Sequence, residues 1–190
     1  MKNKKLVAVL GAVGLLAVSA AAYFGFNSGA AGSLLEDDAF RSVADIDGEE
    51  FHYFDSEAVA LAESSKNDAG LRAIAIEASN LVNDERAAAG LDPLEWDQNL
   101  ESVSHVRAEE CSRNFSHTRP DGRKWYTVNS KIQGGENLAF GFDNAEDAVE
   151  AWMNSPTHRD NILFDEFQEV AISCYRTDDG TVYWAQEYGY

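Results

Sequence analysis

The sequence predicts an α+β fold in which a β-sheet is covered by helices. Between residues 69 and 154, apolar side chains recur at the 3.6-residue period of a helix in several segments. The last part alternates apolar and polar side chains over 169–175 and again over 181–188, with a turn between the two runs. Helices that come first and strands that come later suggest a sandwich of a sheet and its covering helices.

The first 26 residues are predicted to be an export signal or an N-terminal anchor. Three lysines precede an uncharged apolar run at 6–18, and residues 18–20 offer a cleavage site of the small-x-small type. The uncharged stretch continues to residue 26, which is long enough to span a bilayer, so an uncleaved anchor is the alternative. In both cases the lysines stay inside and the remaining chain is exported. We therefore expect a secreted, extracellular protein or one anchored at the cell surface.

Residues 27–69 are predicted to form an acidic linker or arm, and residues 70–190 the folded domain. The arm starts with small residues and continues with many acidic side chains among isolated aromatics such as Phe40, Phe51 and Phe54. A partly ordered spacer is one interpretation, and an arm that lies against the domain or binds a partner is the other.

The first two predicted helices have recognisable ends. The first begins at Ala69 and ends at Gly90, a residue suited to the left-handed C′ position. The second follows Pro93 and uses Asp97 as its N-cap, because an aspartate there can accept a hydrogen bond from a free backbone N–H. It ends before Phe115.

A third helix and a short fourth one are predicted before the strands. The third covers 145–154, and Ser155 and Pro156 then read as the N-cap and first residue of a short helix that carries His158. The segment at 138–141 is predicted to be a shorter strand or a loop.

The charge balance excludes two classes of partner. The chain has 15 basic and 33 acidic residues, which gives a net charge of −18. Nucleic acids and anionic membrane surfaces would be repelled by such a chain, so neither is expected as a partner. A membrane association is expected only if the N-terminal segment stays uncleaved.

Cys111 and Cys174 are the two cysteines of the chain. In an exported protein such a pair favours a disulfide over two buried thiols. Closing the loop of 63 residues (174 − 111) would stabilise the fold by about 4 kcal/mol in the chain-entropy model. We therefore expect a Cys111–Cys174 disulfide.

Three segments carry side chains suited to chemistry. The Pro-Asp-Gly run at 120–122 cannot continue a helix, so it places His117 and Arg119 on a loop. Glu136 follows two glycines, and His158 lies in the short helix. Two imidazoles and one carboxylate suit a metal ion or proton transfer, although their spacing matches no metal signature such as HExxH.

Six short motifs follow one another in the second half of the chain. They are Asn83-x-x-Arg86, Leu91-x-Pro93-Leu94-x-Trp96-Asp97, Ser116-His117-x-Arg119-Pro120-Asp121-Gly122, Gly135-Glu136-Asn137-Leu138, Trp152-Met153-Asn154-Ser155-Pro156-x-His158-Arg159-x-Asn161-Ile162-Leu163 and Tyr183-Trp184-x-Gln186. In this order they resemble the CAP superfamily of cysteine-rich secretory, antigen 5 and pathogenesis-related 1 proteins (the SCP domain). The chain is most similar to its secreted bacterial members, over about residues 72–190. The resemblance implies an α-β-α sandwich.

The resemblance also implies a site. In the family the matching residues line a cleft and can hold a divalent metal, which here names His117, Glu136 and His158, with zinc or another divalent cation as the cofactor. Matched residues expected to support the cleft are Ser116, Arg119, Asn137 and Arg159. Eukaryotic members usually place a second glutamate where this chain has Ser155, so the metal site is incomplete unless Glu146 or Glu150 substitutes.

Several of these residues also have plain structural interpretations. Asn137 is expected to brace its loop by hydrogen bonds. Arg119 and Arg159 are expected to pair with nearby carboxylates such as Asp121 and Asp160. His105 is expected to face solvent from the second helix.

The function expected from the sequence is non-catalytic binding in an extracellular CAP domain. The ligand would be a lipid, a peptide or a wall fragment. One alternative is a metal-dependent hydrolase that uses Glu136 as general base, the one candidate catalytic residue. Another is an interaction protein that acts through its acidic arm. No nucleophile elbow, P-loop or dinucleotide-binding motif is present. Binding is favoured over an enzyme because the resemblance implies a fold and a cleft but no single reaction.

Overall fold

The computed structural model describes residues 8–9, 53–65 and 68–190. The predicted leader, apart from residues 8–9, and the arm before residue 53 lie outside this part of the chain. The helices are α2 (Ser56–Ser65), α3 (Ala69–Ala88), α4 (Gln98–Arg113), α5 (Ala145–Met153), α6 (Pro156–Ile162) and the short 3-10 helix η3 (Trp125–Thr127). The strands are β1 (Ala8–Val9), β2 (Glu95–Trp96), β3 (Gly135–Phe140), β4 (Glu169–Arg176) and β5 (Val182–Gly189). Within these ranges no helix has the length and apolar character that a membrane crossing needs.

The strands form a single mixed sheet in the order β1-β3-β5-β4-β2. β5 lies in the middle and pairs antiparallel with both β3 and β4, whereas the two-residue strand β2 runs parallel to β4. The register of β3 and β5 places Glu136 opposite Glu187 and Asn137 opposite Gln186. The sheet therefore places Glu136 and Asn137 of the Gly-Glu-Asn motif directly beside residues of the C-terminal strand.

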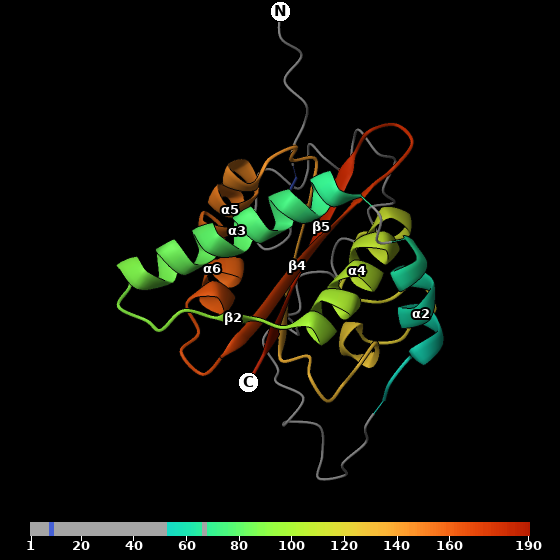
Figure 1. The fold of residues 1–190 in the computed structure, drawn as a ribbon, viewed down its shortest axis with the longest axis horizontal. Coiled ribbons are helices and arrows are strands. Elements are labelled where there is room, and N and C mark those ends of the chain that lie inside the picture. The colour runs from blue at the N-terminus through green and yellow to red at the C-terminus, as the bar shows by residue number, and fades with distance from the viewer. Residues whose placement is uncertain (1–7, 10–52, 66–67) are drawn as a thin grey trace, which may run out of the picture.

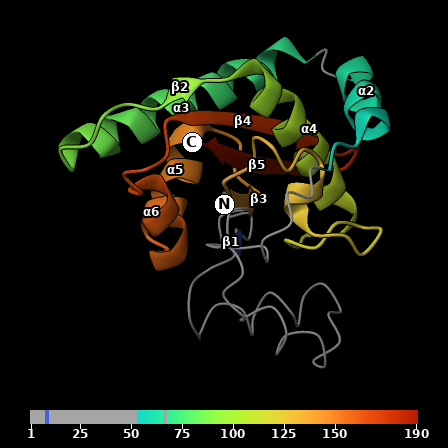
Figure 2. The same ribbon diagram turned by 90° about the horizontal axis from the view of Figure 1, so that it is seen from below.

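Helices cover both faces of the sheet, as Figures 1 and 2 show. α3, α5 and α6 lie on one face, and α4 with α2 lies on the other. The larger apolar cluster lies under α3 and α5 and includes Val82, Trp152, Ile172 and Trp184. A smaller cluster under α4 includes Leu138 and Ala185. The predicted α+β sandwich is confirmed.

Capping residues set the helix boundaries that the sequence predicted. Asp68 accepts hydrogen bonds from Gly70 N and Leu71 N at the start of α3, and Asp97 accepts one from Leu100 N at 2.7 Å at the start of α4. Gly90 follows α3 with a φ of 79°, a conformation that glycine adopts without strain. α6 begins after Ser155 with proline at its first position, although the Ser155 side chain makes no capping hydrogen bond.

The glycine before Glu136 is required by close packing. A Cβ atom on Gly135 would lie 2.7 Å from Cζ of Phe167, so any larger residue would push the ring away. The start of β3 can therefore lie tightly against Phe167, which itself stacks on Tyr188 with ring centroids 4.8 Å apart. This contact fixes the position of the strand that carries Glu136.

Residues 53–65 pack against the domain. Ala58 and Val59 of α2 lie against the cluster of Val103, Val106 and Val128. The backbone N–H of Tyr53 also donates to Ser130 Oγ at 2.6 Å. The domain boundary at residue 70 stays a prediction, and the structure adds contacts from the preceding 53–65 segment.

The expected disulfide is wrong. Cys111 and Cys174 are both buried and free. Ser173 faces α4, since its hydroxyl lies 2.7 Å from Ser104 Oγ, so the next residue of the strand, Cys174, faces the opposite side of the sheet. Cys111 lies on α4 and packs against Ala185, whereas Cys174 belongs to the cluster under α3. The sheet separates the two thiols.

Candidate functional site

The site is built around a hydrogen bond between His117 and Glu136. The loop that follows α4 carries His117, and its carbonyl accepts from Trp125 N, which fastens the loop to η3. Nδ1 of His117 lies 2.7 Å from Oε1 of Glu136, the second residue of β3. The His117 side chain is 29% exposed, whereas that of Glu136 is fully buried. One side of the imidazole is therefore held by a buried carboxylate while part of the ring reaches solvent.

Arg107 of α4 binds the carboxylate of Glu136 through two hydrogen bonds. Its Nε donates to Glu136 Oε2 at 2.7 Å, and its Nη2 donates to Oε1 at 3.3 Å. The same guanidinium donates to Glu110 Oε2 at 2.6 Å and to the carbonyl of Ser116 at 2.8 Å. Arg107 thus joins the helix, the His117 loop and the sheet in one buried contact.

These contacts keep Glu136 ionised. Burial alone would raise the pKa of this carboxyl, but the charge of Arg107 and the hydrogen bond from His117 outweigh it and lower the pKa to about 2. An ionised Glu136 accepts a hydrogen bond, so Nδ1 of His117 carries a proton and donates to Oε1. Glu136 itself is a poor proton acceptor at neutral pH.

The ion pairs continue from Arg107 to the segment that precedes α2. Glu110 accepts from Arg119 Nη2 at 2.8 Å, and the same nitrogen donates to Asp55 Oδ2 at 3.0 Å. Asp55 also accepts from Arg123 at 2.7 Å, and Arg123 hydrogen-bonds the Tyr53 hydroxyl. The predicted pairing of Arg119 with Asp121 is wrong, because Asp121 pairs with Arg123 instead. A series of hydrogen-bonded charges therefore links Asp55 to His117.

Glu187 is a second buried carboxyl beside Glu136. It is fully buried on β5, and its Oε2 accepts from Gln133 Nε2 at 3.0 Å. Burial and the neighbouring charge of Glu136 raise the pKa of Glu187 well above its usual value. Its Oε1 receives no hydrogen bond from the described part of the chain. A protonated Glu187 resolves this, because its O–H can donate to Glu136.

His158 lies deeper than His117. Its residue is 3% exposed, and burial, followed by the charge of His117, lowers the pKa of His158 to about 3. Its Nδ1 has no hydrogen-bond partner within the described residues.

Asn137 braces the sheet against α6. Its Nδ2 lies 3.0 Å from the carbonyl of His158, 3.0 Å from Gln186 Oε1 and 3.1 Å from the Tyr188 hydroxyl. Its Oδ1 accepts from Asn161 Nδ2 at 2.9 Å. With both ends of the amide engaged, Asn137 has a structural role.

Four of the five buried polar atoms without partners lie on the α6 side of the sheet, around this brace. In the part of the chain that the structure describes the five are Ser155 Oγ, His158 Nδ1, Asn161 Oδ1, Gln186 Nε2 and Glu187 Oε1. The first three recur at every third residue from the N-cap of α6 into the helix, and Gln186 hydrogen-bonds Asn137. Glu187 points to the other face of the sheet, toward Glu136.

The residues do not fit a metal ion as they lie here. The described residues contain no group of three or more His, Cys, Asp or Glu side chains placed to hold one. The physical reason is that Glu136, the carboxylate expected to bind metal, is already neutralised by Arg107 at 2.7 Å. Ser155, where a second glutamate was expected in the family pattern, is buried and contributes only a hydroxyl.

The structure places the remaining expected residues less centrally. Ser116 is buried, and its hydroxyl accepts from Thr118 N at 3.0 Å, which stiffens the loop beside His117. Arg159 is exposed on α6 and makes none of the site contacts described above. The expectation that His105 faces solvent is wrong, because it is only 8% exposed.

Sequence reasoning missed Arg107, Glu110 and Glu187. A signal for Arg107 exists, since it follows the apolar Val103 by four residues and precedes Cys111 by four, on one face of the helix. A signal for Glu187 also exists. It points to the face of the strand opposite Trp184 and Gln186, and a sheet that helices cover on both sides buries the side chains of both faces.

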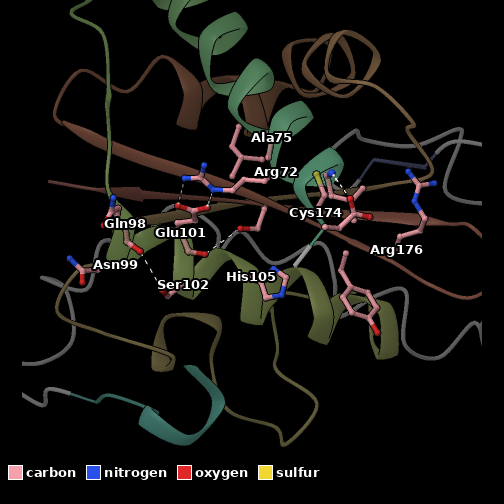
Figure 3. A pocket seen from close by; sticks show the side chains of 14 residues that line it. Arg72, Ala75, Gln98, Asn99, Glu101, Ser102, His105, Cys174 and Arg176 are labelled. Atoms are coloured by element: carbon pink, nitrogen blue, oxygen red, sulfur yellow. Dashed lines mark hydrogen bonds and ion pairs between the residues drawn. The ribbon is translucent and has the colours of Figure 1, made fainter. Parts of the chain in front are cut away.

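A groove of about 570 Å³ lies elsewhere, between α3, α4 and β4. Figure 3 shows Arg72, Glu101, His105 and Cys174 around it. None of the lining residues belongs to the His117, Glu136 and His158 set. The groove and that set are therefore separate features, and the groove is not the predicted cleft.

A sequence model of the cysteine-rich secretory protein family, CAP, matches residues 79–188, which is more than half of the chain. The chain belongs to the CAP family. The matched region contains the His117, Glu136 and His158 site together with Arg107 and Glu187. The resemblance expected from the sequence motifs is thereby confirmed.

Bacterial proteins are among the relatives of this CAP domain. YkwD of Bacillus subtilis (strain 168), described as uncharacterised, is 32% identical over 116 residues, which cover 57% of this chain and 44% of YkwD. The membrane protein YlbC of the same organism is 30% identical over 107 residues, or 51% of this chain and 30% of YlbC. The chain therefore matches less than half the length of these relatives.

Solved structures show the same fold. An extracellular protein of Bacillus anthracis that contains an SCP domain superposes with a TM-score of 0.54 at 26% identity, over 62% of this chain and 40% of the other. An outer surface protein of Borrelia burgdorferi superposes with a TM-score of 0.50 at 20% identity, over 73% of this chain and 96% of the other.

Proposed function

We propose that this chain is an extracellular CAP-domain protein whose site at His117 and His158 binds a ligand without catalysing a reaction on it. Two points support the location: the signal peptide or anchor that the first 26 residues predict, and the similarity to the extracellular Bacillus anthracis protein. The binding part rests on one observation, the partly exposed His117 ring held by the buried Glu136 at 2.7 Å.

The ring nitrogen of His117 that is left for a ligand is Nε2. Glu136 holds a proton on Nδ1, so Nε2 accepts a hydrogen bond when the ring is neutral and donates one when it is protonated. A hydroxyl can meet Nε2 in either state, and hydroxyls occur in lipids, peptides and wall fragments. The unpartnered Nδ1 of His158 is a second polar contact for the same ligand or for a bridging water.

The geometry does not favour the hydrolase alternative. A general base works best with a pKa near the operating pH, but the pKa of Glu136 is lowered to about 2. Arg107 also occupies Glu136 Oε2 at 2.7 Å, so proton uptake there would break a buried ion pair.

Mass spectrometry of small molecules that co-purify with the secreted protein tests the proposal. We expect a molecule that remains with wild type and with Arg72→Gln, a variant outside the site, and that is lost from His117→Phe. Retention by a folded His117→Phe variant would contradict the proposal. Calorimetric titration with zinc tests the metal expectation, since weak zinc binding lost in both His117→Ala and His158→Ala would favour a metal site instead.

A further inference from the structure

Ser155 is an N-cap residue whose hydroxyl does not cap its helix. It precedes α6 with a φ of −98° and a ψ of 119°, the extended conformation of an N-cap residue, but its side chain makes no capping hydrogen bond. By contrast, Asp97 and Asn144 each accept from a backbone N–H of the helix that they precede. Ser155 is fully buried, and its Oγ has no partner within the described residues. The hydroxyl therefore needs a partner outside the helix.

Three further buried polar atoms lack a partner on the same side of the sheet. They are Nδ1 of His158, Oδ1 of Asn161 and Nε2 of Gln186. His158 and Asn161 follow Ser155 at every third residue, which places the three side chains on one face of α6. The side chain of Asn137 joins this face to the sheet. It hydrogen-bonds the His158 carbonyl at 3.0 Å, Asn161 at 2.9 Å and Gln186 at 3.0 Å. The unpartnered atoms thus belong to residues grouped around one buried amide.

Two backbone carbonyls fix the orientation of the side-chain amides. The carbonyl of His158 can only accept, so the atom of Asn137 beside it at 3.0 Å is Nδ2. In the same way, the carbonyl of Glu136 at 3.3 Å identifies Nδ2 of Asn161. Nδ2 of Asn137 then requires the acceptor Oε1 of Gln186 on its other side, at 3.0 Å. The two unpartnered amide atoms are therefore a donor, Gln186 Nε2, and an acceptor, Asn161 Oδ1.

The ring of His158 carries a single proton. Burial, followed by the charge of His117, lowers the pKa of His158 to about 3, so the ring is neutral at neutral pH. Nε2 makes no hydrogen bond within the described residues, but it is not among the buried atoms that lack a partner. It is therefore the ring nitrogen that reaches the surface, whereas Nδ1 points into the interior. The partner of Nδ1 decides which nitrogen holds the proton.

We propose that the four unpartnered atoms on this side of the sheet hold one buried water molecule, which keeps the proton of the His158 ring on Nε2. A water molecule accepts two hydrogen bonds and donates two. This one accepts from the amide of Gln186 and from the hydroxyl of Ser155, and it donates to Asn161 Oδ1 and to His158 Nδ1. Each of the four atoms then has a partner, and the water makes a number of bonds within the usual range of about two to four.

The balance of donors and acceptors places the proton on Nε2. Gln186 Nε2 brings two hydrogens and the Ser155 hydroxyl brings one, whereas Asn161 Oδ1 is the one atom of the four that can only accept. A bare Nδ1 on His158 adds a second acceptor to this set. A proton on Nδ1 would instead add a further donor to a buried group that already has too few acceptors.

The position of this proton determines what a ligand meets at His158. With the proton on Nε2 the surface nitrogen donates, so a ligand group there is a carbonyl, ether or hydroxyl oxygen that accepts. This consequence rests on the proposed function, whereas the water and the ring proton do not. Ser155, Asn161 and Gln186 act on the ligand only through the water and the ring, so they are positioning residues.

A crystal structure of the full chain at a resolution that shows waters tests for the molecule. We expect an isolated density peak within about 3.2 Å of at least three of the four atoms. Density that continues from this position into a larger molecule would show that a ligand group fills it and would overturn the proposal. An interface without any peak there would overturn it as well.

Nitrogen NMR of the His158 ring tests the position of the proton. Correlations between the ring nitrogens and the carbon-bound ring protons distinguish the two neutral forms. In protein dialysed free of small molecules at neutral pH, we expect a protonated Nε2 and a bare Nδ1. A proton on Nδ1, or an equal mixture, would overturn the proposal. Loss of a co-purifying molecule from His117→Phe tests the proposed function separately, so either can fail without the other.

Two substitutions of Ser155 separate the water from the hydroxyl. Ser155→Ala and Ser155→Val both remove the hydroxyl, which caps nothing in wild type. Alanine leaves room for a water with three partners, so the proton should stay on Nε2. Valine fills that room with methyl groups, so the water should be lost and the ring should become a mixture of both forms.

Asn144→Ala provides the control. It removes a side chain that does cap its helix, α5, and should leave the His158 ring unchanged. A proton that stays on Nε2 in folded Ser155→Val would overturn the proposal, because the water would not be what holds it there. If Ser155→Val does not fold, the crystal structure and the wild-type spectrum decide.

Discussion

Arg107 joins three parts of the site, which are Glu136 on the sheet, the Ser116 carbonyl of the His117 loop and Glu110 of its own helix. It is fully buried and pairs with Glu136 and with Glu110, and Arg119 also pairs with Glu110. We expect Arg107→Met to destabilise the protein by about 3–5 kcal/mol, because it leaves a buried carboxylate without its charge partner. Urea denaturation measures the difference.

Arg72→Met provides the control. Arg72 makes a similar two-point contact with Glu101, but its side chain is 50% exposed. Exposed ion pairs contribute little, so we expect a cost below about 1 kcal/mol. If the two variants lost the same free energy of unfolding, the buried ion pairs of Arg107 would contribute no more than the exposed pair of Arg72.

Glu187 should make the protein less stable as the pH rises. Burial and Glu136 raise its folded pKa well above the usual 4.5, so above pH 4.5 the unfolded chain releases a proton that the folded chain keeps. Its stabilising effect is thus complete below pH 4.5 and is lost as the pH rises toward the folded pKa. Glu187→Gln removes this loss. The free energy of unfolding of the variant, relative to wild type, should therefore rise by about 1.4 kcal/mol per pH unit above pH 4.5. A constant difference between the two proteins from pH 5 to 8 would contradict this prediction.

His158 should make the protein less stable as the pH falls. Burial and the charge of His117 lower the pKa of His158 in the folded chain from 6.5 to about 3. Below pH 6.5 the residue therefore binds a proton in the unfolded chain but stays unprotonated in the folded chain. The stability is complete above pH 6.5 and falls by about 1.4 kcal/mol per pH unit down to pH 3. His158→Gln should flatten this acid limb in denaturation measured at pH 4, 5 and 6. If the free energy of unfolding fell with pH as steeply in the variant as in wild type, a group other than His158 would cause the loss of stability in acid.

At the scale of elements, α2 and the residues before it stabilise the site from outside the predicted domain. Asp55 pairs with Arg119 at 3.0 Å, and Ala58 and Val59 cover Val106. A chain that begins at residue 70 should still melt cooperatively but lose about 2–4 kcal/mol, from these apolar contacts and one partly buried ion pair. A chain that begins at residue 53 should match the full chain. A molten, dye-binding product from the shorter chain would show that residues 53–65 belong to the core.

The elements themselves were largely predictable. α3, α4 and α5 begin and end within about two residues of their expected bounds, because Asp97, Gly90 and Pro156 act locally on their own turns. The Asp-Gly turn at 179–180 likewise gives Gly180 a φ of 87° between β4 and β5. Local signals of this kind need no knowledge of the rest of the fold.

At the scale of the whole molecule, the sheet determines the state of the cysteines. Cys111 and Cys174 lie in clusters on its opposite faces, and burial raises the pKa of both thiols, that of Cys111 to about 12. We expect two alkylatable thiols after unfolding without reductant, and a melting temperature that reductant leaves unchanged. A peptide that joins Cys111 to Cys174 in unreduced digests would contradict this.

The sequence by itself determined the family and the order of the elements. It also pointed to His117 and Glu136, which a hydrogen bond joins in the structure, whereas a site shared with His158 stays a prediction. These follow from short motifs and from the period of apolar side chains, which are local properties of the chain. Only the tertiary structure decided which charges meet there. Arg107 and Glu187 reach Glu136 because α4 covers β3 and because β3 pairs with β5 in one register. Such contacts depend on packing between segments distant in sequence, and the same packing separates the cysteines.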